Sequence, residues 1–143
     1  MFDDVIRILK DNIDFADIGQ PQTNASILQA EEELGVTFPR SYCDYLRIWG
    51  WISFGPNEYF GLGSEINDVV DRTKRARKSV KLDDNLIMVC DQDGDEYVCI
   101  DTDVGSGKDS RVIIWDVSNK IISRIRSSNF EEFLRSDLQD FLD

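Results

Sequence analysis

The sequence predicts an α+β fold, a single domain in which a twisted, mainly antiparallel sheet is flanked by about five helices. Two observations support this prediction. Apolar runs at 86–90 and 97–100 flank a segment rich in Gly and Asp at 91–96, which indicates a β-hairpin because both residue types accept the backbone angles of a tight reversal. Amphipathic helical patterns occupy both ends of the chain. We therefore expect the hairpin at the centre of the sheet and the helices packed on it.

The first third of the chain predicts two helices separated by a loop. Apolar residues recur at helical spacing within 2–12, which indicates the first helix. Residues 15–22 are expected to form a linking loop. The second helix is predicted over 25–34, and Gly35 supplies the left-handed residue that commonly ends a helix.

A third helix is predicted from Pro39 to Gly50. Proline suits the first helical position, because its missing N–H would be unpaired there in any case. Large apolar side chains recur along this helix at i, i+3, i+4 and i+7, a broad face that is typical of core packing. These side chains are Tyr42, Tyr45, Leu46 and Trp49.

The rest of the chain alternates strand-like apolar runs with helical patterns, separated by turn formers. The predicted elements are strands at 51–54 and 59–62, a helix at 64–78 with Ile66 facing inward, strands at 111–116 and 120–125, and a C-terminal helix that begins at a capping box, Ser128 to Glu131.

The composition predicts one globular domain over residues 1–143. A hydrophobic fraction of 41% is enough for a core, and no run approaches the length of about 18 apolar residues that a membrane span needs. The acidic N-terminus lacks the pattern of a signal peptide, so we expect a cytoplasmic protein with no membrane partner. Three cysteines in apolar surroundings predict buried thiols and no disulfide framework.

The charge of the chain bears on its partners. A net charge of −12 argues against nucleic acid, because phosphate binding needs Lys and Arg. Charge is also uneven: six of the sixteen basic residues fall within 72–81, whereas 82–103 holds eight acidic residues and no basic one. Such a field favours encounter with a basic protein. The alternative is that the surplus of acid only keeps the domain soluble.

Several kinds of chemistry can be weighed against the sequence. Histidine is absent, which removes the commonest general base and most transition-metal sites. Counted from Asp91, the glycine and the final ligand of a calcium-binding EF-hand loop are misplaced, although a looser site on Asp91, Asp93 and Asp95 stays open. The Gly/Ser loop at 105–107 lacks the Lys-Ser/Thr of a phosphate-binding loop.

Paired carboxylates of the glycosidase kind are also conceivable, but the best candidates, Asp101 and Asp116, are equally explained as strand-end residues that accept backbone hydrogen bonds. We therefore predict no catalytic residue, no metal and no cofactor.

Five motifs occur in a characteristic order and spacing. They are AEEELG at 30–35, Phe38-Pro39 followed by SYCDYLRIWG at 41–50, the Asp/Gly hairpin that runs into YVCIDT at 97–102, VIIWD at 112–116, and NFEEFL at 129–134. Together they resemble the SUKH superfamily, in the branch named for the fungal cell-wall-synthesis regulator. The resemblance covers residues 23–136, and Gly50-Trp51 departs from the polar residue that relatives often show there.

The resemblance implies an α+β fold and, in bacteria, an immunity protein. Such a protein is a small cytoplasmic partner that binds and neutralises a secreted or contact-delivered toxin domain. The implied partner is the C-terminal domain of a cognate polymorphic toxin, commonly a basic nuclease, whose active site would be occluded. Two alternatives remain open: a regulatory scaffold, as in the fungal branch, and an enzyme that uses acidic residues alone or with a metal.

The expected partner-binding residues are surface carboxylates, which can occupy a positive cleft in place of phosphates. Exposed turn tips carry binding residues disproportionately, so the hairpin tip is favoured, although turn chemistry alone would also explain each acid. The predicted residues are Asp91, Asp93, Asp95 and Glu96 at the tip, with Glu58 and Tyr59 as a neighbouring acidic and aromatic pair.

Overall fold

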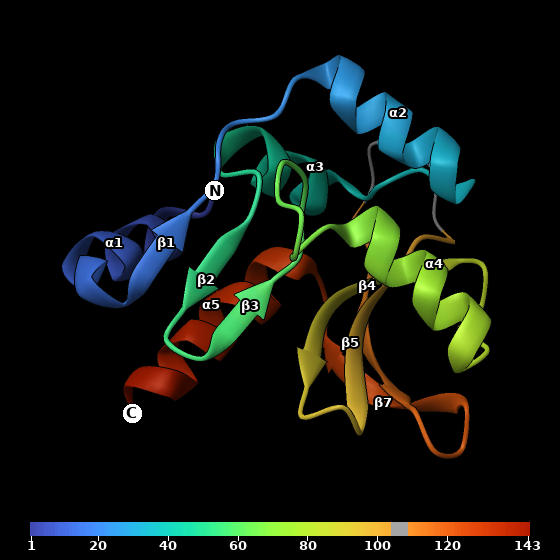
Figure 1. Cartoon of the computed structure of the whole chain (residues 1–143). Helices are drawn as coiled ribbons and strands as arrows, with labels where there is room; N and C mark the ends of the chain where they lie inside the picture. Colours follow the sequence, from blue (N-terminus) through green and yellow to red (C-terminus); the bar gives the residue numbers. More distant parts are fainter. Residues whose placement is uncertain (104–108) are drawn as a thin grey trace.

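The computed structural model describes residues 1–103 and 109–143, so the Gly/Ser loop at 105–107 lies outside the described residues. In the described part of the chain, five α-helices surround two antiparallel sheets (Figure 1), which confirms the predicted α+β class. The helices are α1 (Asp3–Asp11), α2 (Asn24–Leu34), α3 (Arg40–Ile48), α4 (Val69–Ser79) and α5 (Phe130–Leu142); the strands are β1 (Ala16–Ile18), β2 (Ile52–Phe54), β3 (Asn57–Tyr59), β4 (Leu86–Gln92), β5 (Glu96–Asp101), β6 (Val112–Asp116) and β7 (Ile121–Ser127).

The larger sheet is an antiparallel meander in the order β4-β5-β6-β7. Its first two strands form the predicted hairpin, in which Gln92 pairs with Glu96. The chain reverses through Asp93 and Gly94, whose φ angles are 61° and 78°. Gly reaches this left-handed region without strain, and Asp reaches it more readily than most residues do. The turn chemistry that predicted the hairpin is therefore the chemistry that makes it.

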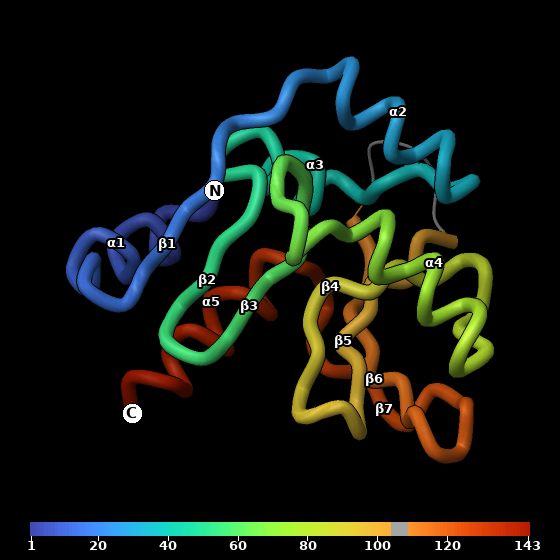
Figure 2. The backbone as a smooth tube through the Cα atoms, in the orientation of Figure 1, coloured from blue at the N-terminus to red at the C-terminus, as the bar shows by residue number. Residues whose placement is uncertain are grey.

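The smaller sheet has the order β1-β2-β3 and differs from the prediction in two ways. The strand β1 lies within 15–22, which was predicted to be a loop; it is too short to show a period of two, and it pairs with β2 far along the chain. The strand predicted at 59–62 ends at Tyr59. Beyond it, the Phe60 N–H donates to the Val89 carbonyl at 2.8 Å, which places β3 beside β4 (Figure 2).

Two helices begin later than predicted. Pro39 lies one residue before α3 as its N-cap, with extended backbone, and does not occupy the first helical position. The fourth helix begins at Val69 because the Asp68 carboxylate accepts hydrogen bonds from the backbone N–H groups of Val70 and Asp71 at 2.7 and 3.0 Å. Ile66 precedes this cap, and with 68% of its surface exposed it does not face inward.

The cap of α5 is shifted by one residue from the predicted box. Asn129, and not Ser128, accepts the backbone hydrogen bond, from the Glu132 N–H at 2.8 Å. Glu131 is therefore not the third helical residue, which in a capping box bonds back to the cap. Its carboxylate accepts the Phe2 N–H at 2.8 Å instead and so ties the start of the chain to α5.

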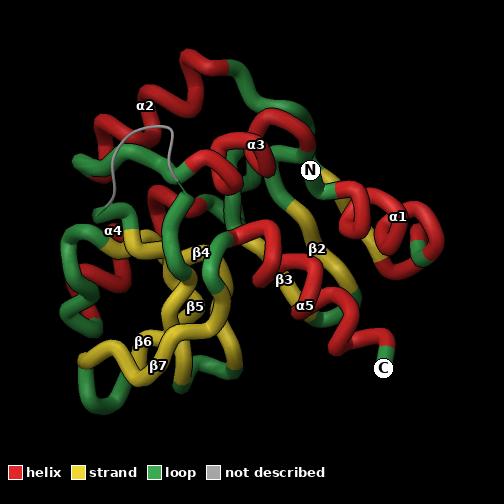
Figure 3. Tube along the Cα trace, turned by 180° about the vertical axis from the view of Figure 1, so that it is seen from behind, coloured by secondary structure: helices red, strands yellow, loops and turns green. Residues whose placement is uncertain are grey.

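The core is built around the aromatic face of α3, as its spacing predicted. Tyr42 and Tyr45 are fully buried, their rings lie 5.6 Å apart, and Phe130 of α5 packs against both. The Tyr42 and Tyr45 hydroxyls donate to the carbonyls of Phe60 and Tyr59 at 2.9 and 2.8 Å. In Figure 3, which views the molecule from behind, α5 lies in front of β2 and β3. One apolar cluster thus spans both sheets.

The cysteines follow the prediction in part. Cys90 and Cys99 are buried in the larger sheet, whereas Cys43 on α3 is only half-buried, and all three are free thiols. Burial raises the pKa of the Cys43 thiol to about 11, which keeps it protonated at neutral pH. None of the helices in the described part of the chain has the length and apolarity that a membrane crossing requires.

Candidate functional site

Two turns meet at one end of the larger sheet. Alternate turns of an antiparallel meander lie at the same end, so the β4–β5 turn and the β6–β7 turn are neighbours (Figures 1 and 3). Between them lies a hollow of about 580 Å³. We call this surface the acidic turn end; it is lined by Gln92, Asp93, Asp95, Glu96, Asp116, Ser118 and Asn119.

Three of the predicted carboxylates lie on the β4–β5 turn, and they differ in whether they have a hydrogen-bond partner. The Asp91 carboxylate accepts the Gly94 N–H at 2.8 Å and so stabilises the reversal. Asp93 and Asp95 are exposed, and their carboxylates have no hydrogen-bond or ion-pair partner within residues 1–103 and 109–143. Asp91 therefore serves the turn, whereas Asp93 and Asp95 are available to a partner.

Glu96, the fourth predicted carboxylate, already has a cation. Arg124 reaches from β7 across β6 and donates two hydrogen bonds to it, at 2.8 and 3.3 Å. These bonds lower the pKa of Glu96, and the cross-strand neighbour Asp116 acts in the opposite direction. Glu96 therefore adds less negative charge to the acidic turn end than Asp93 or Asp95 does.

Asp116 is the residue of this surface that the predicted binding set missed. Its place at the end of a strand predicts a residue that accepts hydrogen bonds, and its carboxylate accepts the Asn119 N–H and side-chain amide at 3.0 and 2.8 Å. These bonds lower its pKa and keep it charged. The strand predicted at 111–116 ends at this residue, but its place directly opposite Glu96 depends on the pairing of β5 with β6.

The other two predicted binding residues differ in burial: Glu58 lies at the surface and Tyr59 lies in the core. Glu58 is exposed on β3, and both Glu58 and Asp91 lie close enough to the Cys90 thiol to add to the rise in its pKa that burial causes. Tyr59 is fully buried, and its hydroxyl donates to the Asp137 carboxylate at 2.5 Å. Burial in the first place, and then Asp137, raises its pKa far above the ordinary value. Only Glu58 of this pair can meet a partner.

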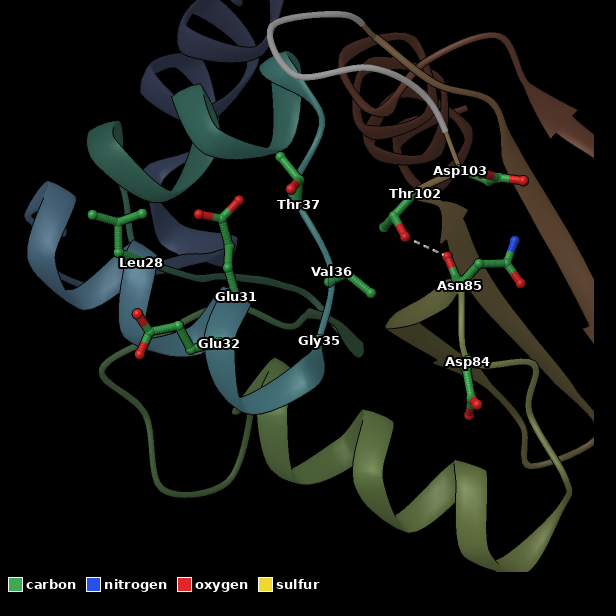
Figure 4. A pocket seen from close by; sticks show the side chains of 10 residues that line it. All are labelled: Leu28, Glu31, Glu32, Gly35, Val36, Thr37, Asp84, Asn85, Thr102 and Asp103. Atoms are coloured by element: carbon green, nitrogen blue, oxygen red, sulfur yellow. Dashed lines mark hydrogen bonds between the residues drawn. The ribbon is translucent and has the colours of Figure 1, made fainter.

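A hollow of about 620 Å³ lies between α2 and the start of β4 (Figure 4). Four carboxylates line it, and Figure 4 shows them pointing in different directions: Glu31, Glu32, Asp84 and Asp103. The Glu31 carboxylate is committed to the Phe38 N–H at 2.6 Å. No sequence pattern predicts that these four carboxylates lie close together, because they come from segments that only the tertiary fold places side by side.

At the acidic turn end, the carboxylates of Glu96 and Asp116 lie on directly paired residues, and the pKa values of both are lowered. Catalytic carboxylates need to converge on one point with separated pKa values. Asp101 is instead a strand-end acceptor: burial would raise its pKa, but hydrogen bonds from the Asp103 N–H, Arg111 and Asn85 lower it. Nor do any three His, Cys, Asp or Glu side chains in the described ranges form a group that could hold a metal ion.

Comparison with known proteins gives a family and a fold. The SUKH_5 family model, described as SMI1-KNR4 cell-wall, matches residues 2–139. Among solved structures, the crystal structure of a protein from Pseudomonas syringae pv. tomato is similar, with a TM-score of 0.64 and 15% sequence identity over 86% of this chain and 90% of that one. At this identity the likeness shows the fold alone. No curated protein matches the chain.

Proposed function

This chain belongs to the SUKH superfamily, and we propose that it is an immunity protein that binds and neutralises one toxin domain in the cytoplasm. SUKH domains are commonly immunity proteins, which is the premise of the proposal. The partner would be the C-terminal domain of a cognate polymorphic toxin that is secreted or delivered by contact. We further propose that this domain is a basic nuclease and that the chain itself has no catalytic activity.

The proposed mechanism of inhibition is that the acidic turn end blocks the active site of the toxin. A nuclease binds phosphates in a positively charged cleft. The carboxylates of Asp93 and Asp95, together with Asp116, would occupy that cleft and exclude the substrate. A twisted four-stranded sheet carries them, so little ordering entropy would be lost on binding.

The observation that carries this proposal is that Asp93 and Asp95 are exposed and have no cation of their own within the described residues. Like charges gathered at one end of a sheet repel one another, and the Asp93 and Asp95 carboxylates make no bond within the described residues that offsets this repulsion. A partner that supplies Lys or Arg would convert this repulsion into attraction, and the same field would speed its approach. A stabilising role is already filled by Asp91 and Glu96, which leaves Asp93 and Asp95 for binding.

The function is tested by protection. Cells that express the toxin domain encoded beside this gene are expected to survive only when they also express this chain. The purified chain should inhibit the toxin's activity at a one-to-one ratio. If cells are not protected, the immunity role is wrong, whatever the surface does.

The binding surface is tested by association kinetics. Asp93→Lys and Asp95→Lys are expected to slow association with the toxin domain by about tenfold at low salt and to flatten its salt dependence. Asp17→Lys, an exposed residue on β1 in the other sheet, changes the net charge equally and is the matched control. Equal effects from the three variants would move the interface away from the acidic turn end, with the immunity role intact.

The description of the matched family, which refers to the cell wall, favours a second candidate. A regulatory scaffold would bind several cellular proteins and would have no toxin gene beside it. A stable complex with several proteins, combined with failure to protect cells, would favour this role.

A further inference from the structure

The helix α4 presents a surface of the opposite charge. It carries five of the six clustered cations and packs on β4, close to Tyr97 of β5. A groove of about 330 Å³ lies between the helix and these strands. We call it the α4 groove; its lining includes Arg72, Arg75, Lys78, Met88 and Tyr97.

The helix dipole accounts for only part of this cluster of cations. Cations are favoured in the last turn of a helix, where Arg77 and Lys78 lie, and the effect falls off within that turn. Arg72 and Arg75 lie nearer the start and the middle of α4. Arg72, Arg75 and Lys78 are also spaced at i and i+3, a separation at which like charges destabilise a helix. The helix dipole therefore does not explain why Arg72 and Arg75 lie along the groove.

The side chains of Arg72, Arg75 and Lys78 differ in the contacts that they make within the domain. The Arg72 guanidinium is held 4.8 Å above the Phe60 ring, and its Nε donates to the Ile66 carbonyl at 3.3 Å. Arg75 pairs with Asp71 at 2.7 Å, but both side chains are more than half exposed, so water competes for this bond. No carboxylate in the described parts of the chain lies within 4.0 Å of Lys78. The groove thus has a positioned guanidinium and two accessible cations.

The floor of the groove is apolar. Met88 is almost wholly buried, and Tyr97, which also lines the groove, is half-buried. Partial burial raises the pKa of the Tyr97 hydroxyl, while Arg72 and Arg75 act in the opposite direction, which places both guanidiniums near the phenol. A methionine and a tyrosine beside cations suit an apolar side chain flanked by anions.

We propose that the α4 groove binds a short acidic peptide segment of a partner protein, with one apolar side chain on Met88 and Tyr97 and carboxylates on Arg72, Arg75 and Lys78. This goes beyond the proposed immunity role, because the groove would repel the basic cleft that the acidic turn end attracts. A long polyanion such as nucleic acid is disfavoured, because Asp71 and Asp91 border the groove and the chain as a whole is strongly negative.

The test uses fluorescence anisotropy with a fluorescein-labelled ten-residue peptide, in which pairs of Glu alternate with single Leu or Phe residues. Lys78→Glu is expected to weaken binding by about tenfold, because a cation in contact with a carboxylate is replaced by a repelling charge. Lys10→Glu is the matched control: the same change at an exposed residue of α1, outside the groove lining. It should alter the affinity by no more than about twofold, since only the screened field changes.

Further measurements test the roles of the carboxylates and of Tyr97, and compare the peptide with a nucleic-acid ligand. A peptide with Gln in place of Glu should not bind, and Tyr97→Ala should weaken binding of the acidic peptide while Tyr97→Phe should not. Equal losses from Lys78→Glu and Lys10→Glu, or no binding of the peptide to the wild-type chain, would overturn the proposal. Tighter binding of a single-stranded oligonucleotide of equal charge would also overturn it, in favour of a nucleic-acid ligand. Circular dichroism confirms that each variant is folded.

Discussion

At the scale of single residues, Tyr59 shows how burial changes the role of a side chain. The sequence predicted it, together with Glu58, as a partner-binding residue near the hairpin tip. In the structure its ring packs 6.1 Å from that of Phe133, and its hydroxyl bonds to Asp137. Asp137 is itself buried and is held from the other side by Arg126 at 3.5 Å. This tyrosine links β3 to α5.

The strength of this link can be measured. Tyr59→Phe is expected to lower the free energy of unfolding by about 1–3 kcal/mol, because it removes the hydrogen-bond donor of the Oδ2 atom of the buried Asp137 carboxylate. Urea unfolding followed by circular dichroism measures the loss. Tyr97→Phe is the control: in the described residues its hydroxyl makes no hydrogen bond, and its removal should change stability by less than about 0.5 kcal/mol. Equal effects would mean that Tyr59 contributes only its ring.

At the scale of elements, the connections around the smaller sheet depend on close backbone approach. The segment after α3 and the segment after β3 cross at Gly50 and Gly61, and the Leu62 N–H donates to the Gly50 carbonyl at 2.9 Å. A Cβ added to Gly61 would lie 1.7 Å from the Gly50 carbonyl oxygen, which is backbone and cannot move aside. The crossing fixes where α4 starts relative to α3.

Gly61→Ala is therefore expected to destabilise the fold by about 3 kcal/mol or more, since the two backbones must separate. Thermal and urea unfolding measure the change. Gly35→Ala gives the comparison: Gly35 ends α2 with a φ of 69° and has no atom within 4 Å of an added Cβ, so only backbone strain of about 1–2 kcal/mol is expected. A mild effect at Gly61 would contradict the close crossing.

At the scale of the whole molecule, the two sheets share one apolar cluster. The Phe60 bond to Val89 and the side chains of α3 and α5 join the smaller sheet to the larger one. Separation of the sheets would expose buried aromatic surface on both sides. The chain should therefore unfold as one cooperative unit over residues 1–143.

Two sets of tryptophan variants test this prediction. Trp115→Phe leaves Trp49 and Trp51 to report on α3 and the smaller sheet, and the double variant Trp49→Phe with Trp51→Phe leaves Trp115 to report on the larger sheet. Within each variant, fluorescence and far-ultraviolet circular dichroism should give the same urea midpoint. Two separate transitions in either variant would show that the sheets unfold independently.

Charge is also organised at the scale of the whole molecule. The acidic turn end gathers carboxylates at the tips of two hairpins, and the α4 groove gathers cations along one helix. On the two proposals above, these surfaces would favour partners of opposite sign, and one domain would contact two different segments.

The sequence by itself determined the features that depend on neighbours a few residues apart. Helical spacing predicted the buried face of α3, and Asp and Gly predicted the β4–β5 reversal, because periodicity and turn chemistry act locally. Only the tertiary structure decided that β1 pairs with β2, that Tyr59 is buried against Asp137, and that Asp116 joins Asp93 and Asp95 at one hollow. Those outcomes depend on contacts between residues far apart in the chain, where burial and register are set by the whole core and no local pattern records them.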